Sequence, residues 1–414
     1  MKHLFFPLIL AFCFLSHGFS QNHSSSNHLV YYSTIAFVET PLSYMEGSIP
    51  LEGFIAKTRN HYRFAYNSKN QLKSVSFYNG ETPRDPNHTA NLFTLAHQMT
   101  FEYSGTQETI SFYDTKGAAV AVLGNVYRFV YQLNELGFRA SLTFEDQNGN
   151  QIENAWSIYN YQWEYQADGS VIEDRFDQEG KGVSIRPGFE FYRLRLFFNP
   201  KGHIALMQNI DQNGSLVENP SGASQDQILT NKEGNFLQWQ VLNNQGELEK
   251  GNGPNVAIGI QKFNEYGYEI ELAHRDENDH PLYSAYGICK SKTTFDKYGN
   301  LSERRFYNES DQAAGHQIAA YHLLKISWDK TGNRRTALRY YGPKDQPTLH
   351  RTRGYHAVQY IYNQDQKLSK ISYLDIAGNL CNRKDNGIAY IQYTYDQQSG
   401  KGKRMSFNKN HQIL

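Results

Sequence analysis

Apolar and polar side chains alternate along many short stretches of the chain. In residues 127–131 (YRFVY), 161–165 (YQWEY) and 391–395 (IQYTY), aromatic or aliphatic side chains recur at every second position. A period of two places these side chains on one face of an extended strand, whereas a helical face needs a period near 3.6. The pattern therefore predicts half-buried β-strands through most of the sequence.

Turn sequences of the form Asp/Asn-x-x-Gly separate these stretches at regular intervals, and in one of them Gln166 stands in the place of Asp or Asn. They fall into two alternating series, and in the first series successive glycines are 32 or 33 residues apart. The first series comprises Gly137, Gly169, Gly202, Gly234, Gly267, Gly299 and Gly332. The second series comprises Gly117, Gly149, Gly180, Gly214, Gly246 and Gly378.

The chemistry of this turn predicts a β-hairpin. An Asp or Asn side chain at the first position accepts hydrogen bonds from backbone amides of the turn, and Gly at the fourth position adopts the left-handed conformation that most residues avoid. A type I turn followed by such a glycine is a common hairpin connection, and its bulge adds twist to the strands. Each turn is therefore expected to join two antiparallel strands.

The repeat of about 33 residues predicts around ten units between residues 57 and 414. Tetratricopeptide and ankyrin repeats share this length, but they need helical spacing. A β-propeller blade needs four strands in about 40–45 residues, and a parallel β-helix would need flat coils instead of hairpin turns. The predicted fold class is all-β, with tandem antiparallel β-hairpins that form an elongated or curled sheet or solenoid.

Several turns resemble the Tyr-Asp (YD) repeats of the RHS family of exported bacterial proteins. The resemblance rests on TFDKYGN at residues 294–300, SWDKTGN at 327–333 and YTYD at 393–396. It implies an exported β-repeat scaffold that contacts carbohydrate or protein, and it transfers no catalytic residues. The composite unit of about 33 residues departs from the RHS pattern, and neither a long shell nor an added C-terminal toxin module is expected.

The first twenty residues have the features of a secretory signal. A short basic start precedes an apolar run from residue 4 to 15, and Gly18 and Ser20 are the small residues that precede a cleavage site. This run is shorter than the roughly 20 apolar residues that span a bilayer. We expect cleavage after Ser20 and a secreted, periplasmic or cell-surface protein. Lipidation at Cys13 is the alternative, but Phe12 occupies the position where a small residue is expected.

The remaining chain divides into two regions. Residues 21–56 are expected to form a flexible leader and an N-terminal cap that covers the first edge of the array. Residues 57–414 are the repeat array, with an irregular insertion at 81–98 for which one or two helical turns are conceivable. No later segment is apolar enough to cross a membrane. Cys289 and Cys381 are almost three units apart, so two separate buried thiols are expected instead of a disulfide.

Composition adds one surface feature to this picture. Lys+Arg and Asp+Glu number 41 each, so total charge does not favour a general polyanion binder. The charges are segregated, however: residues 21–288 carry 19 basic and 31 acidic side chains, and residues 289–414 carry 21 and 10. Arginine and tyrosine side chains in the basic third suit acidic glycans or an acidic protein face. The candidate ligand-binding residues are Arg304, Arg305, Arg334, Arg335, Arg339, Tyr307, Tyr340, Tyr341 and Tyr355.

Other chemistry-bearing residues have simple structural explanations. Turn carboxylates such as Asp296 and Asp329 occupy the position where Asp caps a turn. The pairs His316/His322 and His350/His356 recur with the repeat. We therefore predict no catalytic residue, no metal site and no cofactor.

The preferred hypothesis is an exported, non-catalytic β-repeat scaffold that binds an extracellular or envelope glycan or protein. One alternative is a glycan hydrolase that uses carboxylates on a concave sheet face. Another is a structural envelope protein that assembles head to tail through its oppositely charged ends. Nucleic acid suits the arginines and aromatic rings but not the expected compartment.

Overall fold

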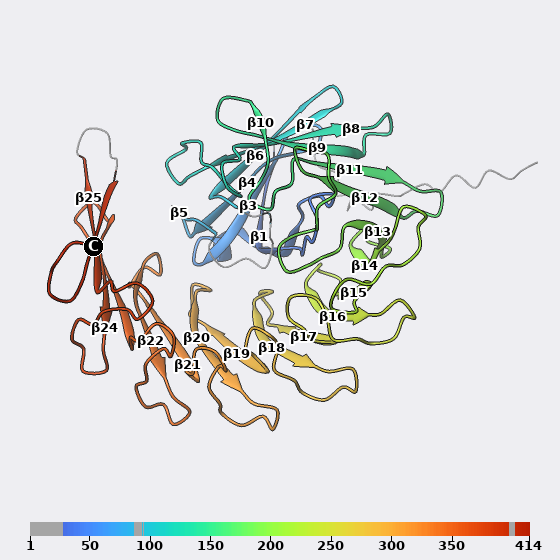
Figure 1. Cartoon of the computed structure of the whole chain (residues 1–414). Coiled ribbons are helices and arrows are strands. Elements are labelled where there is room, and N and C mark those ends of the chain that lie inside the picture. The colour runs from blue at the N-terminus through green and yellow to red at the C-terminus, as the bar shows by residue number, and fades with distance from the viewer. Residues whose placement is uncertain (1–27, 87–92, 94, 397–401) are drawn as a thin grey trace, which may run out of the picture.

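The computed structural model describes residues 28–86, 93, 95–396 and 402–414. This part of the chain contains 26 strands in one sheet and a single helix of four residues, α1 (Gly53–Ala56). Neighbouring strands are antiparallel, and the sheet curls but stays open (Figure 1). The prediction of an all-β array of tandem hairpins is confirmed. The predicted signal with Cys13, residues 21–27 of the predicted leader, and residues 87–92 and 94 of the predicted insertion lie outside the described residues.

The strands follow one another in short, even lengths. The first ten are β1 (His28–Ile35), β2 (Gly47–Leu51), β3 (Asn60–Tyr66), β4 (Leu72–Asn79), β5 (Thr82–Pro83), β6 (Gln98–Ser104), β7 (Gln107–Tyr113), β8 (Arg128–Leu133), β9 (Arg139–Glu145) and β10 (Gln151–Ile152). The next eight are β11 (Asn160–Tyr165), β12 (Val171–Phe176), β13 (Arg193–Phe198), β14 (Ile204–Asn209), β15 (Gln225–Thr230), β16 (Phe236–Leu242), β17 (Ile258–Phe263) and β18 (Glu269–Arg275). The last eight are β19 (Lys290–Phe295), β20 (Leu301–Tyr307), β21 (Leu323–Trp328), β22 (Arg335–Tyr341), β23 (Ala357–Tyr362), β24 (Leu368–Leu374), β25 (Tyr390–Tyr395) and β26 (Gly402–Phe407).

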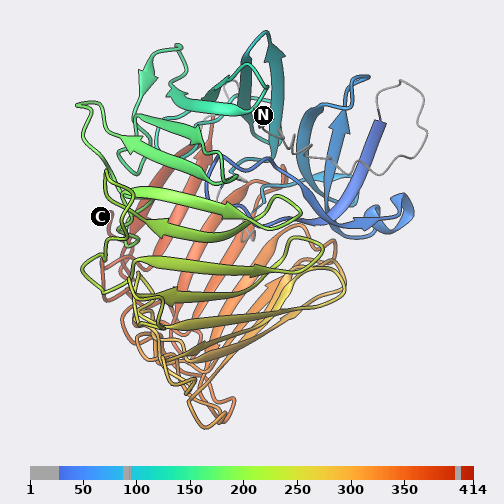
Figure 2. The same ribbon diagram turned by 90° about the vertical axis from the view of Figure 1, so that its right-hand side faces the viewer.

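The order of strands in space follows the order in the chain almost throughout. β2 forms one edge and pairs with β1, which pairs with β3, and the sheet continues through β4, β6, β7, β8, β9 and β11 to β26 at the other edge. The short strands β5 and β10 pair only with β4 and β9. Seen from the side, the green and yellow strands lie one above the other in a continuous wall (Figure 2). Residues 28–51 therefore extend the sheet beyond the first repeat.

The turns have the geometry that the sequence pattern predicts. In the turn after β19, the Asp296 carboxylate accepts hydrogen bonds from the backbone amides of Tyr298 and Asn300, both at 2.9 Å. Gly299 has a φ of 83°, in the left-handed region. The strand register shifts beside this turn, between Thr294 and Phe295, as expected for the bulge. Every glycine of both predicted series has a positive φ.

Several further turns continue the two series without a glycine, and we call the left-handed residue of each such turn its corner. Asp279, Asp311 and Asp345 take the left-handed conformation in the second series, and Asn70 and Gln366 take it in the first. Asn and Asp tolerate this conformation better than other residues with a Cβ. With these positions included, left-handed corners continue at intervals of 31 to 35 residues through the described array, from Asn70 to His411.

Each unit also has a third corner in the loop that leads to the next hairpin. Its positive-φ residues are Gly124, Ser157, Gly188, Gly222, Asn255, Gly287, Ala320, Gly354 and Gly387. Neighbouring loops are joined by backbone hydrogen bonds, such as those from Ala155 to Leu123 and from Ala285 to Pro254, both 2.7 Å. Adjacent units are therefore tied together at the strands and again along the loops.

Residues 36–46, between β1 and β2, lie inside the curl of the sheet. We call this segment the N-terminal plug. Val38 and Leu42 belong to the main hydrophobic core, which extends from β1 to β16. The backbone oxygen of Pro41 accepts hydrogen bonds from the Tyr131 hydroxyl (3.1 Å) and from the Arg139 guanidinium (2.9 Å). The plug thus supplies both apolar side chains and backbone acceptors to the interior of the roll.

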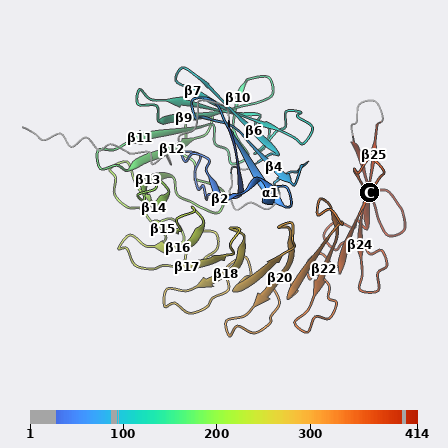
Figure 3. The same cartoon turned by 180° about the vertical axis from the view of Figure 1, so that it is seen from behind.

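The N-terminal strands also meet the tips of hairpins that come much later in the chain. Figures 1 and 3 show the tips of β15–β20 pointing at the dark blue N-terminal segment. The backbone amide of Phe37 donates to Gly234 (2.9 Å), and that of Asn60 donates to Tyr298 (2.8 Å). Arg84 donates to the side-chain oxygens of Asn60 (2.7 Å) and Asn300 (2.8 Å) and to the Gly332 oxygen (3.1 Å). We call this line of contacts the seam.

The array continues beyond the seam. Strands β21–β24 and the loops beside them share a second, smaller core, which is centred on Tyr340, Tyr355, Val358 and Tyr373. Cys289 is buried and Cys381 is partly exposed, and both are free thiols. The expectation of two buried thiols therefore holds for Cys289, whereas Cys381 is only partly buried.

We expect Gly169→Ala to destabilise the protein by roughly 1–2 kcal/mol, the usual cost of a left-handed conformation for a residue with a Cβ. Gly169 has a φ of 84°, and no atom lies within 4 Å of an added Cβ, so conformation alone is tested. Gly182 is the matched control, because it is equally open but has no left-handed φ. Urea unfolding of Gly169→Ala and Gly182→Ala measures the difference in the free energy of unfolding. Equal stabilities would contradict the proposed role of the left-handed turn position.

We expect Arg84→Ala to loosen the seam, because it removes three hydrogen bonds and leaves buried oxygens of Asn60 and Asn300 with fewer donors. Leaving a buried polar group without its partner lowers the free energy of unfolding by on the order of 1–3 kcal/mol. Hydrogen exchange at the amides of Phe37 and Asn60, which donate across the seam, should become faster. Arg193→Ala, on β13 away from the seam, is the control. Unchanged exchange in the Arg84 variant would mean that Arg84 does not hold the seam.

Candidate functional site

A cavity of about 350 Å³ lies at the seam, between the N-terminal strands and the tips of three hairpins. One wall comes from β1, β3 and β4, and the other from the hairpins β15–β16, β17–β18 and β19–β20. Its lining residues are Ser33, Thr34, Ile35, Phe37, Asn60, Tyr62, Phe77, Arg84, Asn235, Phe236, Phe263, Gly267, Tyr268, Glu269, Phe295, Gly299, Leu301 and Arg304. This size and a mainly apolar lining with a few polar groups are typical of small-molecule sites.

Aromatic side chains form most of the walls. The rings of Phe37 and Phe236 stack with their centroids 4.3 Å apart, and those of Tyr268 and Phe295 lie 4.9 Å apart. The first pair joins the plug to a hairpin tip, so the ring contact is itself part of the seam. Flat aromatic surfaces of this kind accept the apolar face of a ring-shaped ligand.

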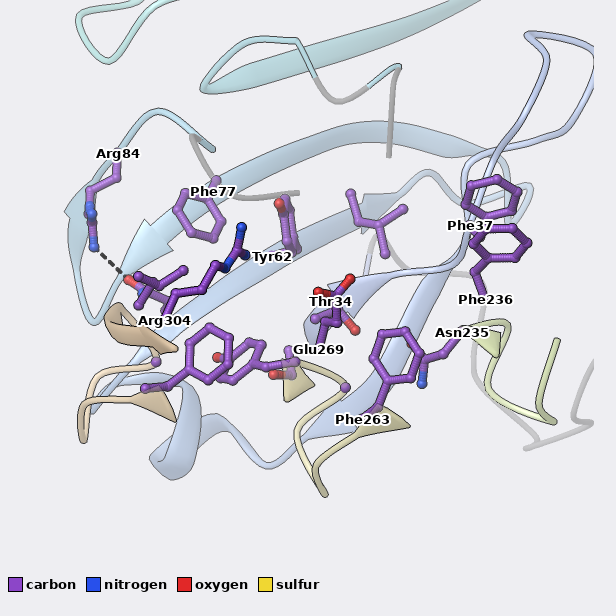
Figure 4. A pocket seen from close by; sticks show the side chains of 18 residues that line it. Thr34, Phe37, Tyr62, Phe77, Arg84, Asn235, Phe236, Phe263, Glu269 and Arg304 are labelled. Carbon is purple, nitrogen blue, oxygen red and sulfur yellow. Dashed lines mark hydrogen bonds between the residues drawn. The ribbon is translucent and has the colours of Figure 1, made fainter. Parts of the chain in front are cut away.

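Arg304 and Glu269 are two of the ionisable side chains that line the cavity, together with Arg84 of the seam. Arg304 points into the cavity toward Tyr62 (Figure 4). Its Nε donates to the Thr293 hydroxyl at 3.3 Å, and within the described residues no hydrogen bond engages its two terminal amino groups. Glu269 accepts a hydrogen bond from the Gln261 amide at 2.9 Å. Burial raises the pKa of Glu269, while the charge of Arg304 acts in the opposite direction.

Two hydroxyl groups of the lining are buried without a partner in the described part of the chain. They are Ser33 Oγ, on a side chain that is 2% exposed, and Tyr268 Oη. A third hydroxyl of the lining, the phenol of Tyr62, has a raised pKa because it is buried. A buried hydroxyl without a partner is costly, and a polar ligand atom would relieve that cost.

The structure separates the sequence-predicted candidates by strand alternation. Arg304 pairs with Thr293 across the hairpin and faces the cavity with Phe295 and Leu301. The next residue, Arg305, faces outward, where it pairs with Asp345 at 2.9 Å and Glu303 at 3.3 Å. Arg304 is therefore the predicted residue that lines the cavity.

The other candidates are divided between the outer face, a turn and the second core. On the outer face, Tyr307 and Tyr341 lie beneath Lys292 and Lys325, and Arg339 is paired in register with Lys325. Tyr340 and Tyr355 are buried in the second core. Arg334 donates to the Gln366 backbone oxygen, and Arg335 lies near the rings of Trp328 and Tyr360. These residues do not form one common surface with Arg304.

The other chemistry considered from the sequence has local partners. The turn carboxylates accept hydrogen bonds from backbone amides of their own turns, as seen at Asp296, Asp329 and Asp375. His322 and His356 each direct Nδ1 at a backbone oxygen, of Phe306 (2.6 Å) and Thr348 (3.1 Å). In the described residues, no group of three or more His, Cys, Asp or Glu side chains is arranged to hold a metal ion.

No helix in the described part of the chain has the length and apolar character needed to traverse a bilayer.

Comparisons with known proteins identify no family. No protein-family model matches the chain, and no curated protein matches it in sequence. A similarity is found to the crystal structure of TcdB2-TccC3 without its hypervariable C-terminal region, with 11% identity, a TM-score of 0.31, and coverage of 86% of this chain and 19% of that one. The chain thus spans about a fifth of that structure.

A second similarity is to a porin-like protein from Bacteroides uniformis, with 11% identity, a TM-score of 0.20, and coverage of 76% of this chain and 94% of that one. Neither similarity indicates an activity. The likeness to YD repeats remains a resemblance in the turn sequences.

We expect Glu269→Gln to stabilise the protein at neutral and alkaline pH. Because its pKa is raised above the ordinary value of 4.5, folded Glu269 holds its proton more tightly than the unfolded chain does. The wild-type protein therefore loses stability as the pH rises above 4.5 through the folded pKa, and the variant does not. Melting temperatures should agree near pH 4 and diverge in favour of the variant toward about pH 8. A variant that is less stable at the higher pH would contradict this.

Proposed function

We propose that the protein is an exported, non-catalytic β-repeat scaffold that binds a small acidic sugar, or the acidic end of a glycan, in the cavity at the seam. The observation that carries the proposal is Arg304, a cation in a cavity walled by aromatic rings, whose terminal amino groups have no hydrogen-bond partner among the described residues. A guanidinium in such surroundings binds a carboxylate through two parallel hydrogen bonds.

The remaining lining suits the other parts of a sugar. The ring of Phe263 lines the cavity, and the C–H face of a sugar ring can pack against it. The unpartnered hydroxyls of Ser33 and Tyr268 supply donors and acceptors for sugar hydroxyl groups. Glu269 adds a further acceptor and, when ionised, partly balances the charge of Arg304.

The arrangement gives less support to the hydrolase alternative. Glycoside hydrolysis in most families needs two carboxyl groups about 5–10 Å apart. Glu269 is the one carboxyl group among the described residues that line the cavity. Binding without turnover is therefore the better-supported activity. Export rests on the features of residues 1–20, and the N-terminal sequence of the mature protein tests it.

We expect glucuronate to raise the melting temperature of the wild-type protein, and glucose to raise it less, because only glucuronate has a carboxylate for Arg304. At a concentration 100-fold above Kd, bound ligand contributes roughly 2.7 kcal/mol of stability. Arg304→Gln should remove the glucuronate effect. Arg305→Gln is the matched control, because the adjacent side chain is on the opposite face, and it should leave the effect intact.

Calorimetric titration on the same variants gives the affinity directly. The proposal fails if glucuronate and related small acidic sugars do not bind, or if Arg304→Gln and Arg305→Gln bind them equally well. Equal binding of glucose and glucuronate would also contradict it, because Arg304 would then have no anionic partner.

A further inference from the structure

A second concave surface lies on the outer side of the seam. It is a cleft of about 680 Å³ between the β4–β5 hairpin and the turns that follow β19 and β21. Hydrogen bonds hold its walls together: the Asn79 amide donates to the Thr331 oxygen (2.9 Å) and to Asn333 (3.0 Å), and the Tyr298 hydroxyl donates to the Lys330 oxygen (2.8 Å). We call it the lysine cleft.

Three lysines line this cleft and give it a positive charge. Lys57 follows α1, and Lys297 and Lys330 stand in the two turns. All three are exposed, and in the described part of the chain none lies within ion-pair distance of a carboxylate. The one acidic side chain in the lining, Glu81, is already paired with Arg63 at 2.7 Å. The carboxylates of Asp296 and Asp329 are engaged by amides of their own turns.

The repeat determines how far apart two of these charges are. Lys297 and Lys330 occupy the same position in successive hairpin turns, one residue after the capping Asp. Successive hairpins are two strands apart, which is about 10 Å. The cleft therefore presents cations at a regular interval along the line of hairpin tips. A flexible polymer with anionic groups at regular intervals can contact them together, and a single small anion cannot.

We infer that the lysine cleft binds an extended acidic polysaccharide with a carboxylate on each sugar or on alternate sugars. Lysine ammonium groups act as compact charges that need no fixed ligand geometry, which suits a polymer that can shift along the cleft. The neighbouring Thr58, Thr331 and Asn333 offer hydroxyl and amide groups to sugar hydroxyls. The inference is independent of the cavity ligand, because Arg304 does not line the cleft and none of the three lysines lines the cavity.

The test is binding of polygalacturonate to the full mature protein at about 50 mM salt and at higher salt. The double variant Lys297→Gln/Lys330→Gln should weaken binding roughly tenfold at low salt and reduce its salt dependence, as expected for loss of two contacts to a polyanion. Lys232→Gln is the matched control. Lys232 has the same position in an earlier turn and lies outside the cleft. The Lys232→Gln variant should therefore bind polygalacturonate as the wild type does.

Further arms separate the cleft from general charge effects. Dextran, a neutral polysaccharide, should not bind. The inference is overturned if polygalacturonate fails to bind, if Lys232→Gln weakens binding as much as the double variant does, or if oligothymidylate binds as tightly with the same lysine dependence. Thermal melting of each variant verifies folding. Arg304→Gln should retain polymer binding even where it loses glucuronate, so failure of the cavity proposal and of this inference are distinguishable.

Discussion

The docking of the N-terminal segment onto hairpins much later in the chain determines most of the architecture. A tandem hairpin array by itself has only neighbour contacts, and its curvature is free to vary. Here the plug fills the interior with Val38 and Leu42, and the seam joins Asn60 to Asn300, 240 residues away. The curl is therefore held at one radius. Both concave surfaces lie where this contact is made, because each is bounded on one side by residues before 86 and on the other by repeat turns.

The repeating part of the fold could be predicted from the sequence because its rules are local. An Asp at the first turn position and a Gly at the fourth, as in Asp296 and Gly299, stabilise the same turn wherever the pair occurs. The spacing of such pairs therefore predicts hairpins directly. A prediction based on glycines alone misses the left-handed turn positions that other residues occupy. At Asp279, Asp311 and Asp345 a short polar side chain takes the left-handed position, and the third corner includes Ser157 and Ala320, which carry no turn signature.

The cavity could be predicted only in part, because its walls are assembled by contacts over long sequence separations. The sequence predicts Arg304 as a candidate because basic residues exceed acidic ones in the C-terminal third and several of its arginines lie near tyrosines. Nothing in that pattern indicated that Arg305 would lie on the opposite face, although strand alternation requires it once the register is known. Ser33, Tyr62 and Phe77 come from outside the glycine-marked units and have no signal that relates them to Arg304. The partner wall of a curled sheet depends on curvature, which the repeat period does not specify.

The seam also has a consequence for the order in which the chain acquires its structure. Hairpins form quickly because their contacts are local, whereas contacts between distant residues require a long loop to close first. The units from β6 onward can therefore assemble by propagation, but the plug cannot be enclosed until the chain has extended to the turn at Gly234, which Phe37 contacts. The seam cannot close completely until the chain has reached Asn333, which Asn79 contacts. An N-terminal segment synthesised first would thus reach its final position among the last. Strands β23–β26, which lie beyond the seam, can form before or after that closing step.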